Sequence, residues 1–277
     1  MLAALGWMAV SARAAAYPDA HPAADADPAV TPDLSTLRSR DGAPFRLWVL
    51  RPPAPPRARL LLIHGYHADH RQVLALAARL RDQGYEAALF ELRGHGGRPG
   101  PYTFGVRELD DADAVLAWGR EQDGPRPLPA AVIGFSAGAA LACQIAARHP
   151  EVQAVVLDSV SPRLRLAIRR EVRLRYRLPP ALLAWLTWWA VQARLRTRLA
   201  RRDPLALAAR LRQPALVIAG GADRRVDEAE SRAFYERWAG PKTWWWDPAA
   251  GHVSLFAKDP AAYTARVAAF LDQALLG

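Results

Sequence analysis

Short apolar runs alternate with longer stretches of helical apolar spacing along this chain of 277 residues. The runs are typical of buried β-strands, because each is brief and is followed by turn-forming or small residues. Alternating strands and helices predict an α/β fold with a mostly parallel central sheet and helices on both faces. We expect strands at residues 45–50, 59–63, 86–90, 130–134, 152–158, 214–219 and 242–246, and helices at 69–83, 105–120, 137–149, 227–239 and 260–275.

A glycine-flanked serine lies between the expected strand 130–134 and the helix that follows it, in the run Gly134-Phe135-Ser136-Ala137-Gly138. A serine at a sharp strand-to-helix turn adopts strained backbone angles, and the glycines let neighbouring segments approach closely. Such a turn lifts the hydroxyl above the sheet edge and directs the first N–H groups of the helix at developing negative charge. Ser136 is therefore the candidate nucleophile.

A serine hydroxyl is a weak nucleophile until a base removes its proton and a third group orients that base. Two residues are placed for these roles. Asp223 follows the expected strand 214–219, and His252 lies on a loop before the last helix. The chain order of the candidate residues is thus serine, aspartate, histidine.

Backbone N–H groups that could stabilise an alkoxide are expected beside this serine. The strand 59–63 ends in His64-Gly65-Tyr66-His67. The N–H groups of Tyr66 and of Ala137 are the expected donors, each worth about 3 kcal/mol to a transition state. We expect the site to be lined by His64, Gly65, His95 and Phe135.

Six segments carry a resemblance to known proteins: LLLIHGYHADH (60–70), FELRGHGGRPG (90–100), VIGFSAG (132–138), VVLDSVSP (155–162), LVIAGGADRRV (216–226) and AGH (250–252). They resemble the α/β-hydrolase superfamily, in particular the bacterial group that includes serine-aminopeptidase-like and monoglyceride-lipase-like hydrolases. The resemblance covers the chain from about residue 44 to its end. It implies an α/β-hydrolase fold, a Ser-Asp-His triad in this order and a lid after the sixth strand. Glu91 departs from the pattern, because relatives usually carry an aspartate before Arg-Gly-His-Gly.

Two other carboxylates compete with Asp223 for the role of triad acid. Asp158 ends the expected strand 152–158, a position that some relatives use, and Asp227 is a weaker alternative. We favour Asp223 because a carboxylate after the seventh strand is the commoner arrangement in this fold. His67 and His70 have a spacing that could suggest a metal site, but they lack a third ligand, so structural or solvated roles are favoured. We expect neither a metal nor a cofactor.

The length and composition fit one domain, because 51 % hydrophobic and 23 % charged residues are globular values and α/β folds of this size run as one unit. We expect the domain at 44–277, with an insertion at 161–205. Residues 2–16 resemble a signal-peptide core without a basic start, and 17–43 are expected to be an extended or disordered lead-in. These features leave the location open between cytoplasm and export. The apolar stretch is too short for an ordinary transmembrane helix.

The positive charge is concentrated in one part of the chain. The formal net charge is +10, and the segment 163–212 holds 14 arginines, no lysines and two acids, or +12. Its centre, 181–191, is apolar and contains three tryptophans. Three interpretations stay open: a helical cap with solvated arginines, a cap that meets an anionic membrane or lipid surface, and a nucleic-acid or other polyanion surface. Nucleic acid is disfavoured because no recognised binding motif accompanies the charge.

These patterns predict a serine hydrolase that cleaves a carboxylic ester or related acyl bond of a small molecule through an acyl-enzyme. An aminopeptidase and an acyltransferase would use the same residues and remain alternatives. A non-enzymatic interaction protein on the same fold is a further alternative, which the presence of every catalytic part disfavours.

Overall fold

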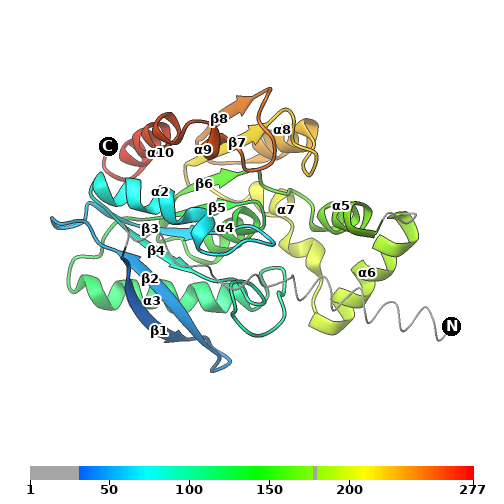
Figure 1. Ribbon diagram of the computed structural model, residues 1–277, viewed down its shortest axis with the longest axis horizontal. Coiled ribbons are helices and arrows are strands. Elements are labelled where there is room, and N and C mark those ends of the chain that lie inside the picture. Colours follow the sequence, from blue (N-terminus) through cyan, green and yellow to red (C-terminus); the bar gives the residue numbers. More distant parts are fainter. Residues whose placement is uncertain (1–30, 177–179) are drawn as a thin grey trace.

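The computed structural model describes residues 31–176 and 180–277 and contains one mixed sheet of eight strands in the order β1-β2-β4-β3-β5-β6-β7-β8 (Figure 1). β1 and β2 pair antiparallel, as do β2 and β4, and all other neighbours are parallel. The strands are β1 (Asp33–Arg38), β2 (Pro44–Leu50), β3 (Ala58–Ile63), β4 (Tyr85–Phe90), β5 (Ala130–Phe135), β6 (Val152–Asp158), β7 (Ala215–Gly220) and β8 (Lys242–Asp247).

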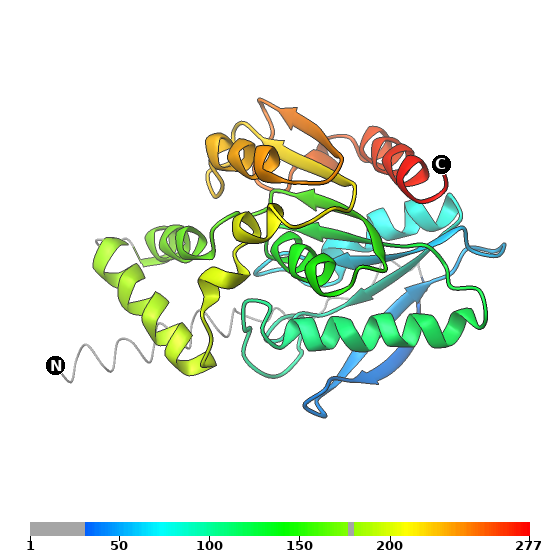
Figure 2. The same cartoon turned by 180° about the vertical axis from the view of Figure 1, so that it is seen from behind.

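Helices cover both faces of this sheet. One face carries α2 and α10, with the short α9 beside α10, and the other face carries α3, α4, α7 and α8 (Figures 1 and 2). The helical segments are α2 (Arg71–Asp82), α3 (Glu108–Asp123), α4 (Ala137–Arg148), α5 (Leu164–Tyr176), α6 (Pro180–Leu195), η1 (Leu199–Arg202), α7 (Pro204–Ala208), α8 (Glu228–Arg237), α9 (Leu255–Lys258) and α10 (Pro260–Leu275).

The central strands separate two apolar layers. Every residue of β3 is buried, as expected for a strand covered on both faces. Because successive side chains alternate, Leu60 and Leu62 pack with α2 and α10, whereas Leu61 and Ile63 pack with α3 and α4. Because β3 to β8 all run in the same direction, they end at one common edge of the sheet, where the candidate residues lie.

The seven expected strands all form, and the sheet also contains β1, which the sequence pattern missed. β1 is an edge strand with mostly exposed side chains, including Leu34 at 57 % exposure, so it has no apolar run to reveal it. Its pairing with β2 places the start of the sheet at Asp33, earlier than the expected domain start at residue 44. The signal-like stretch at residues 2–16 lies outside the described residues.

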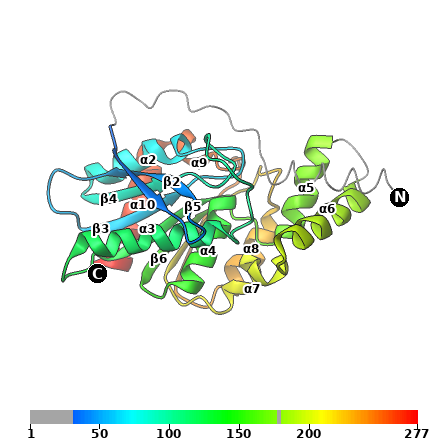
Figure 3. The same cartoon turned by 90° about the horizontal axis from the view of Figure 1, so that it is seen from below.

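The segment between β6 and β7 forms a helical insertion that protrudes from the body of the molecule, at the end away from the C-terminus (Figure 3). It consists of α5, α6, η1 and α7. Its two ends are tied together, because the Asp203 carboxylate accepts a hydrogen bond from the Leu164 N–H at 2.9 Å and the Pro162 carbonyl accepts one from the Leu205 N–H at 3.0 Å. Among the described residues, no helix combines the length and the apolar character needed to cross a membrane.

Candidate active site

Ser136 lies at a strained turn between β5 and α4. Its backbone angles are φ 52° and ψ −107°, a conformation that a non-glycine residue rarely adopts. The turn needs glycine on both sides: a Cβ at Gly134 would lie 2.4 Å from the Gly138 carbonyl oxygen, and one at Gly138 would lie 2.3 Å from that of Ile63. The close packing of α4 on β3 and β5 therefore depends on the two glycines of the motif.

Asp223, His252 and Ser136 form a continuous chain of hydrogen bonds. The Nδ1 atom of His252 lies 2.7 Å from Asp223 Oδ2, and its Nε2 atom lies 2.8 Å from Ser136 Oγ. An ionised carboxylate only accepts hydrogen bonds, so Nδ1 carries the proton and Nε2 is left as the acceptor for the serine hydroxyl. The sequence separations of 29 and 116 residues show that the fold creates this arrangement.

The carboxylate of Asp223 is held in place from its other side. The side chain is 2 % exposed, and its Oδ1 atom accepts hydrogen bonds from the N–H groups of Arg225 at 2.7 Å and Val226 at 3.0 Å. These bonds form a tight turn after β7. The turn fixes the oxygen that faces His252.

The rival acids have other partners. Asp158 is completely buried and accepts hydrogen bonds from Ser159 Oγ and from the Tyr263 hydroxyl, both at 2.8 Å. Burial raises the pKa of Asp158 to about 6. Asp227 caps α8 by accepting the Ala229 N–H at 2.8 Å. Asp158 nevertheless supports the histidine loop indirectly, because Ser159 Oγ accepts the N–H of Val253 at 3.0 Å.

The loop after β3 lies beside the nucleophile. A Cβ at Gly65 would lie 3.5 Å from Ser136 Cβ. Gln72 on α2 holds the loop, since its Oε1 atom accepts the Gly65 N–H at 2.7 Å. Tyr66 and Ala137 both line the pocket at Ser136, and Ala137 is the first residue of α4, whose N–H has no acceptor within the helix. The sequence did not point to Gln72, because nothing distinguishes it from other polar residues in the first turn of a helix.

His64 braces this loop from below. Its ring is fully buried, and its Nε2 atom accepts the Leu92 N–H at 3.0 Å. The proton is therefore on Nδ1, which donates to the Gly65 carbonyl at 2.8 Å. This geometry suits a positioning role in the oxyanion loop.

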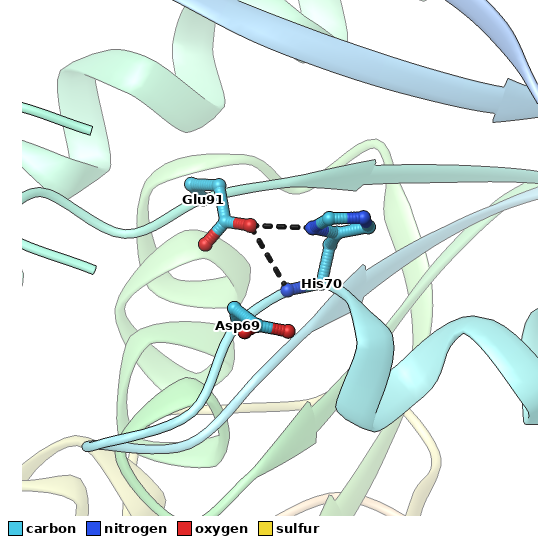
Figure 4. A group of neighbouring side chains, drawn as sticks. All are labelled: Asp69, His70 and Glu91. Carbon is cyan, nitrogen blue, oxygen red and sulfur yellow. Dashed lines mark hydrogen bonds and ion pairs between the residues drawn. The ribbon is translucent and has the colours of Figure 1, made fainter. Parts of the chain in front are cut away.

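Asp69, His70 and Glu91 form a group of potential metal ligands among the described residues (Figure 4). Their hydrogen bonds are those of a brace between β4 and α2: Glu91 Oε1 accepts the His70 N–H at 3.2 Å and bonds to His70 Nδ1 at 2.5 Å. Asp69 is ion-paired with Arg71. Burial opposes ionisation of Glu91, but the His64 and His70 rings beside its carboxylate outweigh this effect and lower the pKa of Glu91 to about 2. The glutamate that departs from the family pattern thus anchors the segment that follows the oxyanion loop.

A pocket opens above Ser136 and His252, and the insertion supplies much of its wall. Its lining is mostly apolar and includes a few charged side chains, a composition suited to a small organic acyl group. The lining residues are Tyr66, Tyr102, Phe104, Ser136, Ala137, Ala140, Ser161, Leu164, Ala167, Ile168, Arg170, Glu171, Val172, Thr187, Arg225 and His252.

The residues that line the pocket do not include His64, Gly65, His95 or Phe135, which were expected to line the site. His64 and Gly65 belong to the oxyanion loop and its brace, and Phe135 packs on Tyr263 with ring centroids 6.5 Å apart. His95 supports the pocket wall, because its buried ring lies 5.5 Å from that of the lining residue Tyr66. Burial lowers the pKa of His95 to about 3, so this imidazole is neutral.

Glu171 joins the insertion to two loops of the site. It lies on α5, accepts a hydrogen bond from His67 Nε2 at 3.2 Å and one from Arg225 Nη1 at 2.7 Å. The bond from His67 lowers the pKa of Glu171 to about 2, and Arg225 acts in the same direction. His67 directly follows Tyr66, a candidate oxyanion donor, and Arg225 lies two residues after the candidate acid Asp223. We refer to Glu171, His67 and Arg225 as the cap clasp.

Comparisons with known proteins agree with this fold. Residues 54–209, more than half of the chain, match the family described as serine aminopeptidase, S33. The chain belongs to this family, and with it to the α/β-hydrolases. Family and fold together define a hydrolase.

The curated relatives are uncharacterised proteins. Rv2307c of Mycobacterium tuberculosis is 32 % identical over 195 residues, which cover 70 % of this chain and 62 % of the relative. RP471 of Rickettsia prowazekii is 40 % identical over 73 residues, 26 % of this chain and 30 % of the relative. The chain thus spans less than two thirds of the length of these relatives.

Solved structures share the fold at low sequence identity. The Pyrococcus furiosus esterase Pf2001 has a TM-score of 0.76 and 22 % identity, with 94 % of this chain and 99 % of that chain covered. Est1E of Butyrivibrio proteoclasticus, solved with ferulic acid, has a TM-score of 0.68 and 17 % identity over 88 % of this chain and 100 % of the other. An α/β serine hydrolase homologue from Coxiella burnetii has a TM-score of 0.62 and 19 % identity over 87 % and 98 % of the two chains.

Proposed function

We propose that this protein is a serine esterase that cleaves a carboxylic ester of a small molecule through an acyl-enzyme. The observation that carries the proposal is the unbroken hydrogen-bond chain from Asp223 through His252 to Ser136. A pocket with a mostly apolar lining supports an acyl substrate. The neighbouring esterase structures agree with this class of reaction.

The proposed reaction has two stages. His252 Nε2 takes the proton of Ser136 as Oγ attacks the carbonyl carbon, and the N–H groups of Tyr66 and Ala137 stabilise the oxyanion. The protonated imidazole then donates to the departing alcohol, which leaves Ser136 acylated. Water, deprotonated by His252, attacks the acyl-enzyme and releases the carboxylic acid. Asp223 keeps the imidazole in the required tautomer and stabilises its charged form throughout.

The charges at the pocket favour an ester over a peptide with a free amino terminus. An aminopeptidase has to hold a substrate ammonium group near the nucleophile, which requires an available acidic side chain. Among the residues that line the described pocket, Glu171 is the acidic one, and it is already bound to His67 and Arg225.

Hydrolysis of p-nitrophenyl esters of increasing acyl length tests this proposal. We expect turnover by the wild type, and a loss of about 10⁴-fold or more in kcat for Ser136→Ala. Ser161→Ala is the matched control, because Ser161 lines the same pocket and has no role in the proposed reaction; its activity should stay near that of the wild type. An active Ser136→Ala variant would refute the assignment, and faster cleavage of amino-acid p-nitroanilides than of esters would favour the peptidase.

A further inference from the structure

Two large aromatic side chains are exposed together on α6. Trp185 and Trp189 are 47 % and 53 % exposed, and their rings are in edge contact with centroids 6.4 Å apart. They lie one helical turn apart on a helix that has no charged residue before Arg194. Soluble proteins rarely leave adjacent tryptophans in water without a use, so this surface requires a partner.

The same helix separates this surface from the candidate active site. Its inner face buries Ala184, Trp188 and Val191, and Thr187 lines the pocket above Ser136. In the views of Figures 1 and 3, α6 lies at the outer end of the protruding insertion. A partner that binds the exposed tryptophans would therefore approach the pocket from the side of the insertion.

The insertion that carries the tryptophans is strongly positive. Arg194, Arg196 and Arg198 follow the apolar part of α6, and all three are exposed. The segment 163–212 carries a formal charge of +12, while the rest of the chain carries −2. A partner with a negative surface and an apolar interior would be complementary both to the positive charge and to the exposed tryptophans.

We infer that the outer part of the insertion is a docking surface for anionic lipid bilayers, with Trp185 and Trp189 on α6 and with Arg194, Arg196 and Arg198 at and beyond the C-terminal end of that helix. Tryptophan rings favour the boundary between headgroups and acyl chains, and guanidinium groups bind lipid phosphates while their stems cover apolar area. The inference goes beyond the proposed function and does not depend on it, because the docking surface contains none of the proposed catalytic residues.

Vesicle co-sedimentation with the full chain tests the surface. The wild type should sediment with vesicles of phosphatidylcholine and phosphatidylglycerol, and much less with phosphatidylcholine alone. Trp185→Ser combined with Trp189→Ser should lower the apparent partition constant about tenfold or more. Leu34→Ser removes an exposed apolar side chain on β1 and should leave binding unchanged. Hydrolysis of water-soluble esters should be the same for all these proteins, which shows that they are folded.

The charge contribution is tested with two matched triple variants. Arg194→Gln, Arg196→Gln and Arg198→Gln together should weaken binding at least about tenfold. The control replaces Arg40, Arg46 and Arg126, three exposed arginines outside the insertion, by glutamine and lowers the net charge equally.

Three results would overturn the inference. Equal losses in the two triple variants would mean that binding follows net charge alone. Binding to DNA or heparin that depends on the same tryptophans would assign the surface to another polyanion. A change from dimer to monomer in the double tryptophan variant would assign it to a second copy of this chain. The variant Ser136→Ala should bind vesicles like the wild type. A failure of the proposed reaction would therefore be distinguishable from a failure of the docking inference.

Discussion

At the scale of single residues, the main question is which carboxylate acts as the triad acid. Asp223 bonds to His252 Nδ1, whereas Asp158 is bound to Ser159 and Tyr263. Asp223→Asn should lower kcat about 10⁴-fold, because an asparagine that donates to Nδ1 stabilises the wrong tautomer. Asp158→Asn should cost far less, since it alters only the support of Val253. Steady-state kinetics on a p-nitrophenyl ester compares the two, and the reverse ranking would transfer the role to Asp158.

Asp158 should also leave a signature in the pH dependence of stability. Its pKa is raised from 3.8 to about 6 in the folded state by burial. The folded protein therefore binds a proton that the unfolded chain releases, and the stabilisation of the protonated form is lost as pH rises from about 4 to about 6. Between about pH 4 and pH 6, the free energy of unfolding of Asp158→Asn should therefore rise by roughly 3 kcal/mol relative to that of the wild type. Urea unfolding at pH 4 and pH 7 measures this change. A difference in unfolding free energy between the two proteins that is the same at both pH values would contradict the account.

Some site residues could be predicted from the sequence because a rule connects them to local patterns. Parallel strands end at one edge of the sheet, so Ser136, Asp223 and the residues after β3 were expected to meet. The supporting residues obey no such rule. The bond from His67 to Glu171 joins residues 104 positions apart, and only the scarcity of acids in an arginine-rich segment could have singled out Glu171.

At the scale of elements, the cap clasp should control how firmly α5 is held against the site. Glu171→Gln keeps the size of the side chain and removes the charge that binds His67 and Arg225. We expect a loss of stability of about 1–2 kcal/mol near neutral pH and faster trypsin cleavage within the insertion. Because the folded-state pKa is about 2 against 4.5 for the free group, the stability difference should shrink as pH falls below about 4.5.

The matched control for the clasp is Glu121→Gln on α3. Glu121 is exposed and lies on a helix outside the insertion, so its replacement should change neither stability nor cleavage measurably. Equal trypsin cleavage of the Glu171 variant and the wild type would show that the clasp does not hold the insertion. A Glu171 variant that is less stable but is not cleaved faster would show that Glu171 stabilises only the loops of His67 and Arg225.

Elements could be predicted wherever burial imposed a period on the sequence. The central strands and the helices that cover them follow from this rule, as β3 illustrates with six buried residues. β8 was predicted from its apolar tryptophans, although none of its residues is fully buried. β1 lacks the signal because an exposed edge strand is stabilised by pairing with β2 rather than by burial. The helices of the insertion could be predicted only as a segment, since their packing depends on side chains of the body.

At the scale of the whole molecule, the chain consists of a nearly neutral body and a strongly basic insertion. The body carries the proposed nucleophile, base and acid, while the insertion closes the pocket and supplies most of the charge. Two acids in the insertion hold this arrangement: Asp203 ties its ends together, and Glu171 ties it to the catalytic loops. The esterase structures share the fold at about one fifth sequence identity, so the substrate depends on the pocket of this chain.

Labelling with a fluorophosphonate probe tests the central claim most directly, because the probe reacts only with a serine that a neighbouring base has activated. The account predicts stoichiometric labelling of the folded wild type, located on Ser136 by peptide mass mapping, and none in Ser136→Ala. His252→Ala should abolish labelling as well. A folded wild type that does not react, or a label that remains when Ser136 is replaced, would contradict the account.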